Sequence, residues 1–243
     1  MDNFTPAKLA EFGVWFIVFL FSSTLHEAGH ALLARMGGDD TAYLGGQVSL
    51  NPMPHIRREP FGMILVPVIT FFMMGWMMGW ASTPYDPRWA QRYPGRQALM
   101  SAAGPIANLI IAAAAFGALA ALLSSGVFVS PEPDQLTFSS LAQPASRFAP
   151  GSILHPLAAV LSVGLSLNLL LFIFNLLPLP PLDGSGVLHG LFPDSVGRVI
   201  EMLSRNPMMS LLGLVLAWQV FPQVFMPAFA LVLWLLHPGI YAG

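Results

Sequence analysis

His26, Glu27 and His30 form the sequence HEAGH inside an otherwise apolar run, residues 12–34. Residues four apart lie one turn above each other on a helix, so the two imidazoles can bind one metal ion. A zinc ion that keeps an open coordination position lowers the pKa of a bound water molecule to about 7 and creates a nucleophile. Glu27 can then accept that proton and pass it to a leaving amine. The motif predicts metal-assisted hydrolysis, with His26 and His30 as ligands and Glu27 as the catalytic acid/base.

The same five-residue pattern also arises by chance, and in a soluble protein it is more often a solvated helix face than a site. The composition argues against that interpretation. Of the 243 residues, 55% are hydrophobic and only 9% are charged, against about 25% charged residues in soluble domains. The chain is therefore expected to be a membrane protein, in which ionisable groups are costly and are retained mainly for function.

Composition also limits the ligands and partners. The chain contains no cysteine, which excludes disulfides and thiolate ligands, so any metal must be bound by His, Asp or Glu. Its net charge is −2, and it lacks the basic footprint of proteins that bind nucleic acids, so no nucleic-acid partner is expected.

Asp183 is the best candidate for a third metal ligand. It lies in FNLLPLPPLDGSGVL, residues 174–188, where three prolines end a helix and Gly184 permits a sharp turn. Irregular backbone is tolerated at membrane depth only where protein or a watery cavity covers it. Taken alone, the stretch is typical of an interfacial turn with Asp183 in water. Combined with HEAGH, it favours a shared metal site.

Three motifs together resemble the site-2 protease family of intramembrane zinc metalloproteases, in particular a compact bacterial branch. The motifs are LHEAGHA (25–31), AGPIANLII (103–111) and the 174–188 stretch, in the order of the family. They cover most of the expected core.

The resemblance implies roles for individual residues. It implies Zn²⁺ as the cofactor, with His26, His30 and Asp183 as its ligands and Glu27 as the acid/base. Asn175 matches a family asparagine thought to hold the substrate backbone or the transition-state oxyanion. A further residue, Asn108 in the second motif, matches a position of close helix packing, and we favour an interhelical hydrogen bond as its only role.

The expected fold is an all-α polytopic membrane protein, forming one membrane-embedded domain over residues 1–243. Its helical core should have about four to six membrane segments, with a small strand-like hairpin and a re-entrant segment. Residues 43–50 are strand-like and would either pair with an extended substrate or cover the site as a hairpin. Windows of about 20 apolar residues give five candidate segments: 12–34, 61–81, 98–123, 153–177 and 207–236.

The shared metal site constrains the topology. His26 lies near the exit of the first segment and Asp183 beyond the exit of the fourth, so the two meet only if 61–81 enters and leaves by one face. Eight of the ten basic residues then share the side of the site, which the positive-inside rule makes cytoplasmic, with the N-terminus outside. These eight are Arg35, Arg57, Arg58, Arg88, Arg92, Arg96, Arg198 and Arg205, whereas Lys8 and Arg147 lie opposite.

Two functions from different classes fit these observations. The first is an intramembrane zinc metalloprotease of the bacterial inner membrane, which hydrolyses peptide bonds within or next to transmembrane helices near the cytoplasmic face. Its partners would be a transmembrane protein or peptide substrate and the lipid bilayer. The alternative is a non-catalytic zinc-binding membrane scaffold or transporter, although transporters usually place polar residues on several spans. His55, in the loop NPMPHIRRE, is expected to be a surface or capping group.

Overall fold

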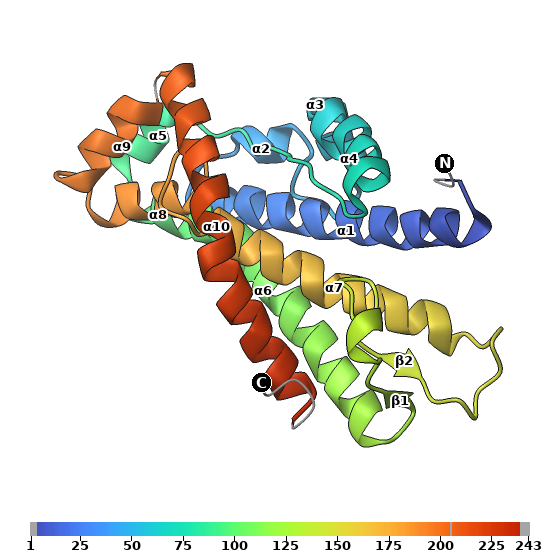
Figure 1. Ribbon diagram of the computed structural model, residues 1–243. Helices are drawn as coiled ribbons and strands as arrows, with labels where there is room; N and C mark the ends of the chain where they lie inside the picture. Colours follow the sequence, from blue (N-terminus) through green and yellow to red (C-terminus); the bar gives the residue numbers. More distant parts are fainter. Residues whose placement is uncertain (1–3, 205, 239–243) are drawn as a thin grey trace.

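A computed structural model describes residues 4–204 and 206–238 of the chain. Four helices in this part are long and apolar enough to cross a membrane. Figure 1 shows α6 running antiparallel to α1 and α7, and α6 packs against both. The predicted all-α polytopic architecture is thus confirmed. The four helices are α1 (Pro6–Met36), α6 (Pro94–Ser124), α7 (Leu154–Asn175) and α10 (Pro207–Leu236).

Shorter elements connect the four long helices. A two-stranded antiparallel sheet, β1 (Phe128–Val129) with β2 (Gln143–Pro144), closes the connection between α6 and α7. The short helices are α2 (Thr41–Leu44), α3 (Met53–Arg58), the π-helix Phe61–Leu65, α4 (Val66–Met74), α5 (Pro87–Arg92), the 3₁₀ turn Pro133–Gln135, α8 (Asp183–Leu191) and α9 (Val196–Ser204).

Residues 43–50 do not form the strand that their sequence suggested. The first two of them end α2, and the rest form a turn and bends. Gly46 has a φ of 75°, a left-handed conformation that glycine adopts readily, and its amide donates to the Tyr43 carbonyl. The Gln47 amide donates back to Ala42. Local turn bonds therefore replace the ladder that a strand would need.

Residues 61–81 form the expected re-entrant segment. The π-helix and α4 form a first arm, Gly75 reverses the chain with a φ of 82°, and an extended second arm runs back alongside the first. The Trp80 amide donates to the Gly62 carbonyl at 3.2 Å, so the two ends of the segment lie side by side. At the tip, the Lys8 ammonium at the start of α1 lies 4.5 Å from the centre of the Phe71 ring. We refer to residues 61–83 as the hairpin.

His55 is fully buried, so its expected surface position is wrong. Its Nδ1 lies 3.4 Å from Gln47 Nε2, and its Nε2 lies 3.4 Å from the Ser49 carbonyl oxygen. Burial lowers the pKa of His55. The residue thus helps to anchor the turn after α2 instead of facing solvent.

Candidate metal centre

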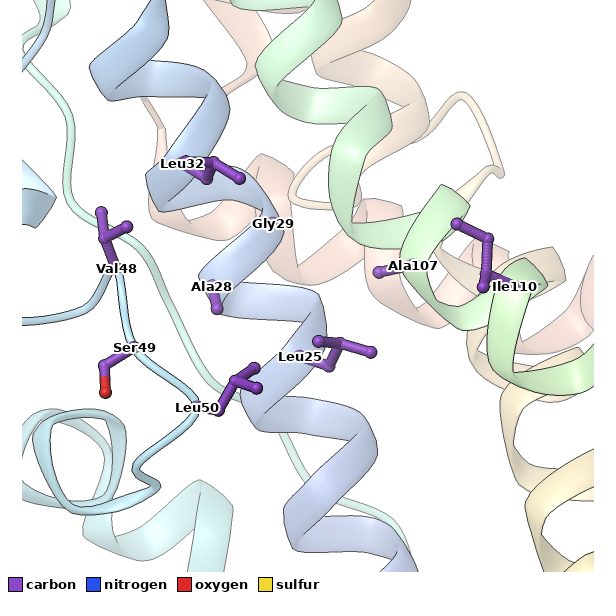
Figure 2. Close-up of a pocket in the computed structure, with 9 residues that line it drawn as sticks. All are labelled: Leu25, Ala28, Gly29, Leu32, Val48, Ser49, Leu50, Ala107 and Ile110. Atoms are coloured by element: carbon purple, nitrogen blue, oxygen red, sulfur yellow. The ribbon is translucent and has the colours of Figure 1, made fainter. Parts of the chain in front are cut away.

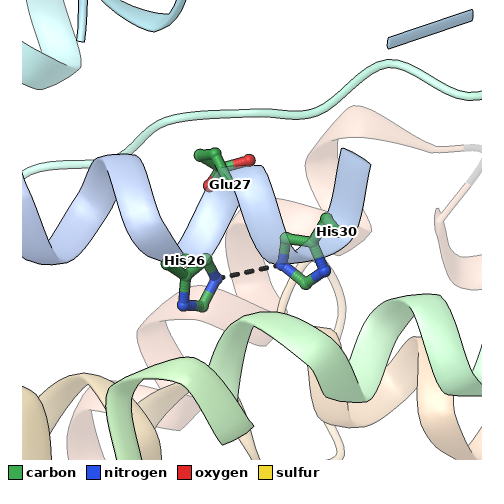
Figure 3. A group of neighbouring side chains, drawn as sticks. All are labelled: His26, Glu27 and His30. Atoms are coloured by element: carbon green, nitrogen blue, oxygen red, sulfur yellow. Dashed lines mark hydrogen bonds between the residues drawn. The ribbon is translucent and has the colours of Figure 1, made fainter. Parts of the chain in front are cut away.

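The HEAGH motif lies in the second half of α1, and all three of its ionisable side chains are buried. His26 Nε2 and His30 Nε2 are 3.0 Å apart. Figure 3 shows both rings projecting toward α6, whereas the Glu27 side chain projects toward the extended arm of the hairpin. The possible ligand atoms of these three residues all lie within 4.8 Å of one another.

Asp183, the first residue of α8, completes the group. Its Oδ2 lies 3.1 Å from His26 Nε2, and its Oδ1 lies 3.3 Å from His30 Nε2. The structure therefore brings together the four residues that the sequence singled out. Asp183 follows the three residues of the HEAGH motif by more than 150 positions in the chain.

Glycines in α8 allow the approach of Asp183. A Cβ at Gly184 would lie 2.2 Å from the Leu176 carbonyl oxygen, so the start of α8 folds tightly against the end of α7. A Cβ at Gly190 would lie 2.2 Å from the Pro94 carbonyl oxygen. Only glycine fits such backbone contacts. The glycines of α8 thus let this helix pack directly on α6, with Asp183 facing the two imidazoles.

Hydrogen bonds to the outer ring nitrogens orient the two imidazoles. His26 Nδ1 lies 2.6 Å from Asn108 Oδ1, and His30 Nδ1 lies 2.7 Å from the Met100 carbonyl oxygen. Both partners are acceptors, so each Nδ1 carries a proton, and a neutral ring of this tautomer presents an unprotonated Nε2. Asn108 makes the expected interhelical hydrogen bond, but its partner His26 is a candidate metal ligand, which the expectation of helix packing alone did not include.

The donor set fits a tetrahedral metal ion. Zinc bonds of about 2.0 to 2.1 Å imply ligand atoms a little over 3 Å apart, and here they are separated by 3.0, 3.1 and 3.3 Å. Among the described residues, Asp183 Oδ2 is a buried atom without a hydrogen-bond partner. A cation would stabilise two imidazole lone pairs and a carboxylate that converge in this way.

Gly104 in α6 leaves the space beside these donors open. A Cβ at this position would lie 2.3 Å from His30 Nε2 and 2.5 Å from His26 Nε2. The glycine of the AGPIANLII motif thus keeps a side chain out of the metal position.

A cavity of about 1120 Å³ opens onto the centre. One wall is apolar and includes Trp76, Leu171 and Trp218, whereas Gln97 and His189 lie elsewhere on its lining. Asn175, at the end of α7, also lines this cavity, and its Nδ2 donates to the Leu171 carbonyl at 3.0 Å. The structure thus places Asn175 on the same cavity as Glu27 and Asp183.

Sequence reasoning missed two polar residues of the centre. Thr83, at the base of the hairpin, places its Oγ1 2.7 Å from Glu27 Oε2 and 3.0 Å from the Glu27 carbonyl oxygen. Asn168 in α7 accepts a hydrogen bond from Asn108. Asn168 lies seven residues before Asn175, and neither spacing nor composition distinguishes it or Thr83.

A second hollow, of about 430 Å³, lies on another side of the motif helix. Figure 2 shows its lining, which is mostly apolar and comes from α1, from the turn after α2 and from α6. None of the ionisable residues of the metal centre lines it. His26, Glu27, His30 and Asp183 all line the larger cavity instead.

Comparison with known proteins identifies the family. The model of peptidase family M50 matches residues 14–218. YwhC of Bacillus subtilis is 35% identical over 197 residues, which cover 81% of this chain and 77% of that protein. Rip2 of Mycobacterium tuberculosis strain H37Rv is 29% identical over 220 residues, 88% of this chain and 71% of Rip2. Both relatives carry the description "Putative zinc metalloprotease".

No solved structure matches the chain. The family model nevertheless covers α1 from residue 14 onward, the hairpin, α6, α7 and α8, which are the elements that build the candidate metal centre. The chain therefore belongs to peptidase family M50, the site-2 protease family that its motifs resemble.

Proposed function

We propose that the protein is an intramembrane zinc metalloprotease that hydrolyses peptide bonds within or next to transmembrane helices of other membrane proteins. The observation that carries this proposal is the convergence of His26, His30 and Asp183 beside Glu27 in a cavity among membrane helices. Membership of peptidase family M50 and the descriptions of the relatives support the metallopeptidase chemistry.

In this proposal His26, His30 and Asp183 would hold the zinc ion. Zinc, when bound, supplies Lewis acidity that makes a water molecule acidic near neutral pH and polarises the scissile carbonyl. Glu27 accepts the proton as the water oxygen attacks the carbonyl carbon, and then delivers it to the amide nitrogen as the C–N bond breaks. Thr83 holds the Glu27 carboxylate during both transfers, through the hydroxyl that lies 2.7 Å from Oε2.

Asn175 would contact the substrate in the same cavity. Its Nδ2 donates one hydrogen to the Leu171 carbonyl, and an amide nitrogen carries a second hydrogen that can be donated. A substrate carbonyl or the developing oxyanion is the partner that this donor would stabilise.

The substrate class follows from the cavity walls. The cavity combines aromatic and aliphatic side chains with polar groups, so it suits an apolar segment that has been unwound. Helical amides are engaged in hydrogen bonds and must be freed before attack. The extended arm of the hairpin, residues 76–83, lines this cavity, and an extended segment could lie alongside it.

The proposed location is the bacterial inner membrane, with the metal centre near the cytoplasmic face. The support is the distribution of basic residues, since eight of the ten are predicted to share the side of the metal centre. Seven of these eight lie in the described part of the chain, and Arg205 lies outside it. Positive charges of this kind are retained on the cytoplasmic side.

Exchange of Glu27 for Gln tests the proposal. The purified protein and the Glu27→Gln variant would be compared for zinc content and for cleavage of a model transmembrane substrate in one membrane assay. Loss of the proton carrier should lower cleavage by about 10²- to 10⁴-fold, while zinc content stays that of the wild type because the three ligands remain. A zinc-binding scaffold or transporter, the alternative function, would bind zinc without cleaving in either form. Cleavage at the wild-type rate by the variant would contradict the role of Glu27.

A further inference from the structure

A chain of buried polar groups runs from His26 into the contact between α1, α6 and α7. Asn108 Oδ1 lies 2.6 Å from His26 Nδ1, and Asn108 Nδ2 donates to Asn168 Oδ1 at 2.8 Å. Asn168 Nδ2 in turn donates to Ser22 Oγ at 2.9 Å and to the Gly164 carbonyl oxygen at 2.8 Å. The side chains of Ser22, Asn108 and Asn168 are all fully buried. We refer to Asn108 and Asn168 as the amide relay.

The direction of the relay is fixed at its far end by a backbone atom. The Gly164 carbonyl oxygen can only accept, so the Asn168 atom that faces it must be the NH₂ group. The oxygen of Asn168 then faces Asn108, which must present its own NH₂ group in return. The oxygen of Asn108 is thereby turned toward His26, whose Nδ1 must carry the proton. Each amide orientation follows from the one before it, with no free choice.

The orientation of the relay also determines the protonation of the other nitrogen of the His26 ring. A neutral imidazole protonated at Nδ1 has its lone pair at Nε2, and His26 Nε2 is the atom that faces Asp183 and His30. If the relay were reversed, two NH₂ groups or two oxygens would face each other at one of its links. Buried mismatches of this kind are costly.

The partner ring is held differently. His30 Nδ1 meets the Met100 backbone carbonyl directly, at 2.7 Å, so no side chain intervenes. Only His26 depends on side chains for its tautomer and orientation. That asymmetry makes the relay testable by substitution.

We propose that Asn168 is a positioning residue for the metal centre, which acts through Asn108 to present His26 Nε2 as a ligand. The inference rests on the proposed function of the centre, because it assigns His26 to the metal. Asn168 lies beyond Asn108 from the ring, and its hydrogen bonds are made with Asn108, Ser22 and Gly164.

Two substitutions that keep the branched shape of the Asn side chain separate this role from simple helix packing. Asn168→Leu removes the relay, leaves Asn108 free to turn and keeps the interface apolar. Asn168→Asp retains an acceptor oxygen facing Asn108, so it preserves the orientation of Asn108 but places a carboxylate in the interior. A positioning role predicts weaker zinc binding by the Leu variant than by the Asp variant. A packing role predicts the reverse order, because an apolar side chain fits a buried helix contact better than a charge does.

The measurement is the zinc dissociation constant of the full-length protein in detergent, by competition with a chelator of known affinity. Loss of an outer hydrogen-bond partner of a ligand typically weakens metal binding by about 10- to 100-fold, and we expect this for Asn168→Leu. The control is Ser166→Ala, two residues away on α7. Ser166 is also buried, and within the described part of the chain its Oγ has no hydrogen-bond partner, so this variant should bind zinc like the wild type.

A double variant provides a rescue. Asn108→Asp offers only acceptor oxygens to His26 Nδ1, so it needs nothing behind it to set its orientation. Adding Asn108→Asp to Asn168→Leu should therefore restore zinc binding close to that of the wild type. This variant also decides the question if Asn168→Leu alone does not fold, because weak zinc binding by the folded double variant would overturn the inference.

The outcomes distinguish the inference from the proposed function. If the wild type binds no zinc, the proposed metal centre itself fails. If the wild type binds zinc and cleaves, but Asn168→Leu binds zinc equally well, only the positioning role of Asn168 is wrong.

Discussion

Thr83 and Glu27 are 56 positions apart in the chain, yet a hydroxyl and a carboxylate oxygen meet at 2.7 Å. The contact links the hairpin to the proposed catalytic acid/base. Hydrogen bonds to charged groups contribute about 1.5 to 3 kcal/mol. A side chain outside the HEAGH motif thus controls where the Glu27 carboxylate lies.

Exchange of Thr83 for Val, which has nearly the same shape, should lower kcat by about 10- to 100-fold, the kinetic equivalent of one charged hydrogen bond. Zinc content should not change, because Thr83 contacts none of the three proposed ligands. Thr83→Ser retains the hydroxyl and should retain most of the activity. Equal activity of the Val and Ser variants would show that the contact with Glu27 is not used in catalysis.

Gly104 gives a prediction about metal binding. In Gly104→Ala the new Cβ would lie 2.3 to 2.5 Å from the two Nε2 atoms, so the rings must shift and the zinc content of the purified protein should fall. Gly117→Ala on the same helix is the matched control, because a Cβ there has no neighbour within 4 Å. Full zinc loading of both variants would contradict the position assigned to the metal.

Sequence reasoning predicted His26, Glu27, His30 and Asp183 because charged groups in an apolar chain are few and each requires a partner. It did not predict Thr83 or Asn168. Hydroxyl and amide side chains are common in helices and loops, and their partners here lie on other elements at distances in the chain that follow no period. Such contacts become visible only when the packing of α1, α6 and α7 is known.

At the scale of elements, the hairpin is the feature that sequence reasoning captured through geometry. A shared metal site was incompatible with a full crossing by 61–81, and the structure brings the ends of that segment together at Gly62 and Trp80. The strand expected at 43–50 failed because local propensity was the only support for it. Two consecutive glycines allowed that stretch to close a turn on α2 instead.

Close contact between the two arms of the hairpin gives a prediction for Gly62. A Cβ there would lie 2.2 Å from the Trp80 carbonyl oxygen, so Gly62→Ala forces the arms apart, at a cost of about 1 to 3 kcal/mol in stability. Because Thr83 follows this contact, cleavage should fall at least as much as in Thr83→Val, with zinc content unchanged. Gly13→Ala in α1, where a Cβ meets nothing within 4 Å, should behave as the wild type. Normal cleavage by Gly62→Ala would mean that the hairpin does not position Thr83.

At the scale of the whole molecule, four crossings place the connections of the chain at two ends. Figure 1 shows α2, α5 and α9 toward one end and the β1–β2 sheet toward the other. The metal centre lies in the half of α1 that faces the first end. This arrangement agrees with the sequence argument that brings Asp183 back to the face where the first segment exits, once 61–81 is not a full crossing.

Single cysteines test that arrangement, since the chain has no cysteine of its own. Asp40, Arg88 and Gln135 are exposed and lie before the hairpin, after it and between α6 and α7. Cysteines at Asp40 and Arg88 should react with a membrane-impermeant thiol reagent only from the cytoplasmic side, and a cysteine at Gln135 only from the opposite side. Labelling of the first two from different sides would mean that 61–81 crosses the membrane.

The two imidazoles differ in how their outer nitrogens are held, and this difference bears on the choice of metal. The ring anchored by a main-chain carbonyl has a partner that no side-chain exchange can replace. The outer nitrogen of the other ring donates to a side-chain amide. A substitution can replace this amide with a carboxylate, and a carboxylate partner makes the imidazole a stronger electron donor. Substitutions that alter the metal preference of the centre, in evolution or in design for cobalt or manganese, can therefore act through the outer hydrogen-bond partner of only one of the two imidazoles.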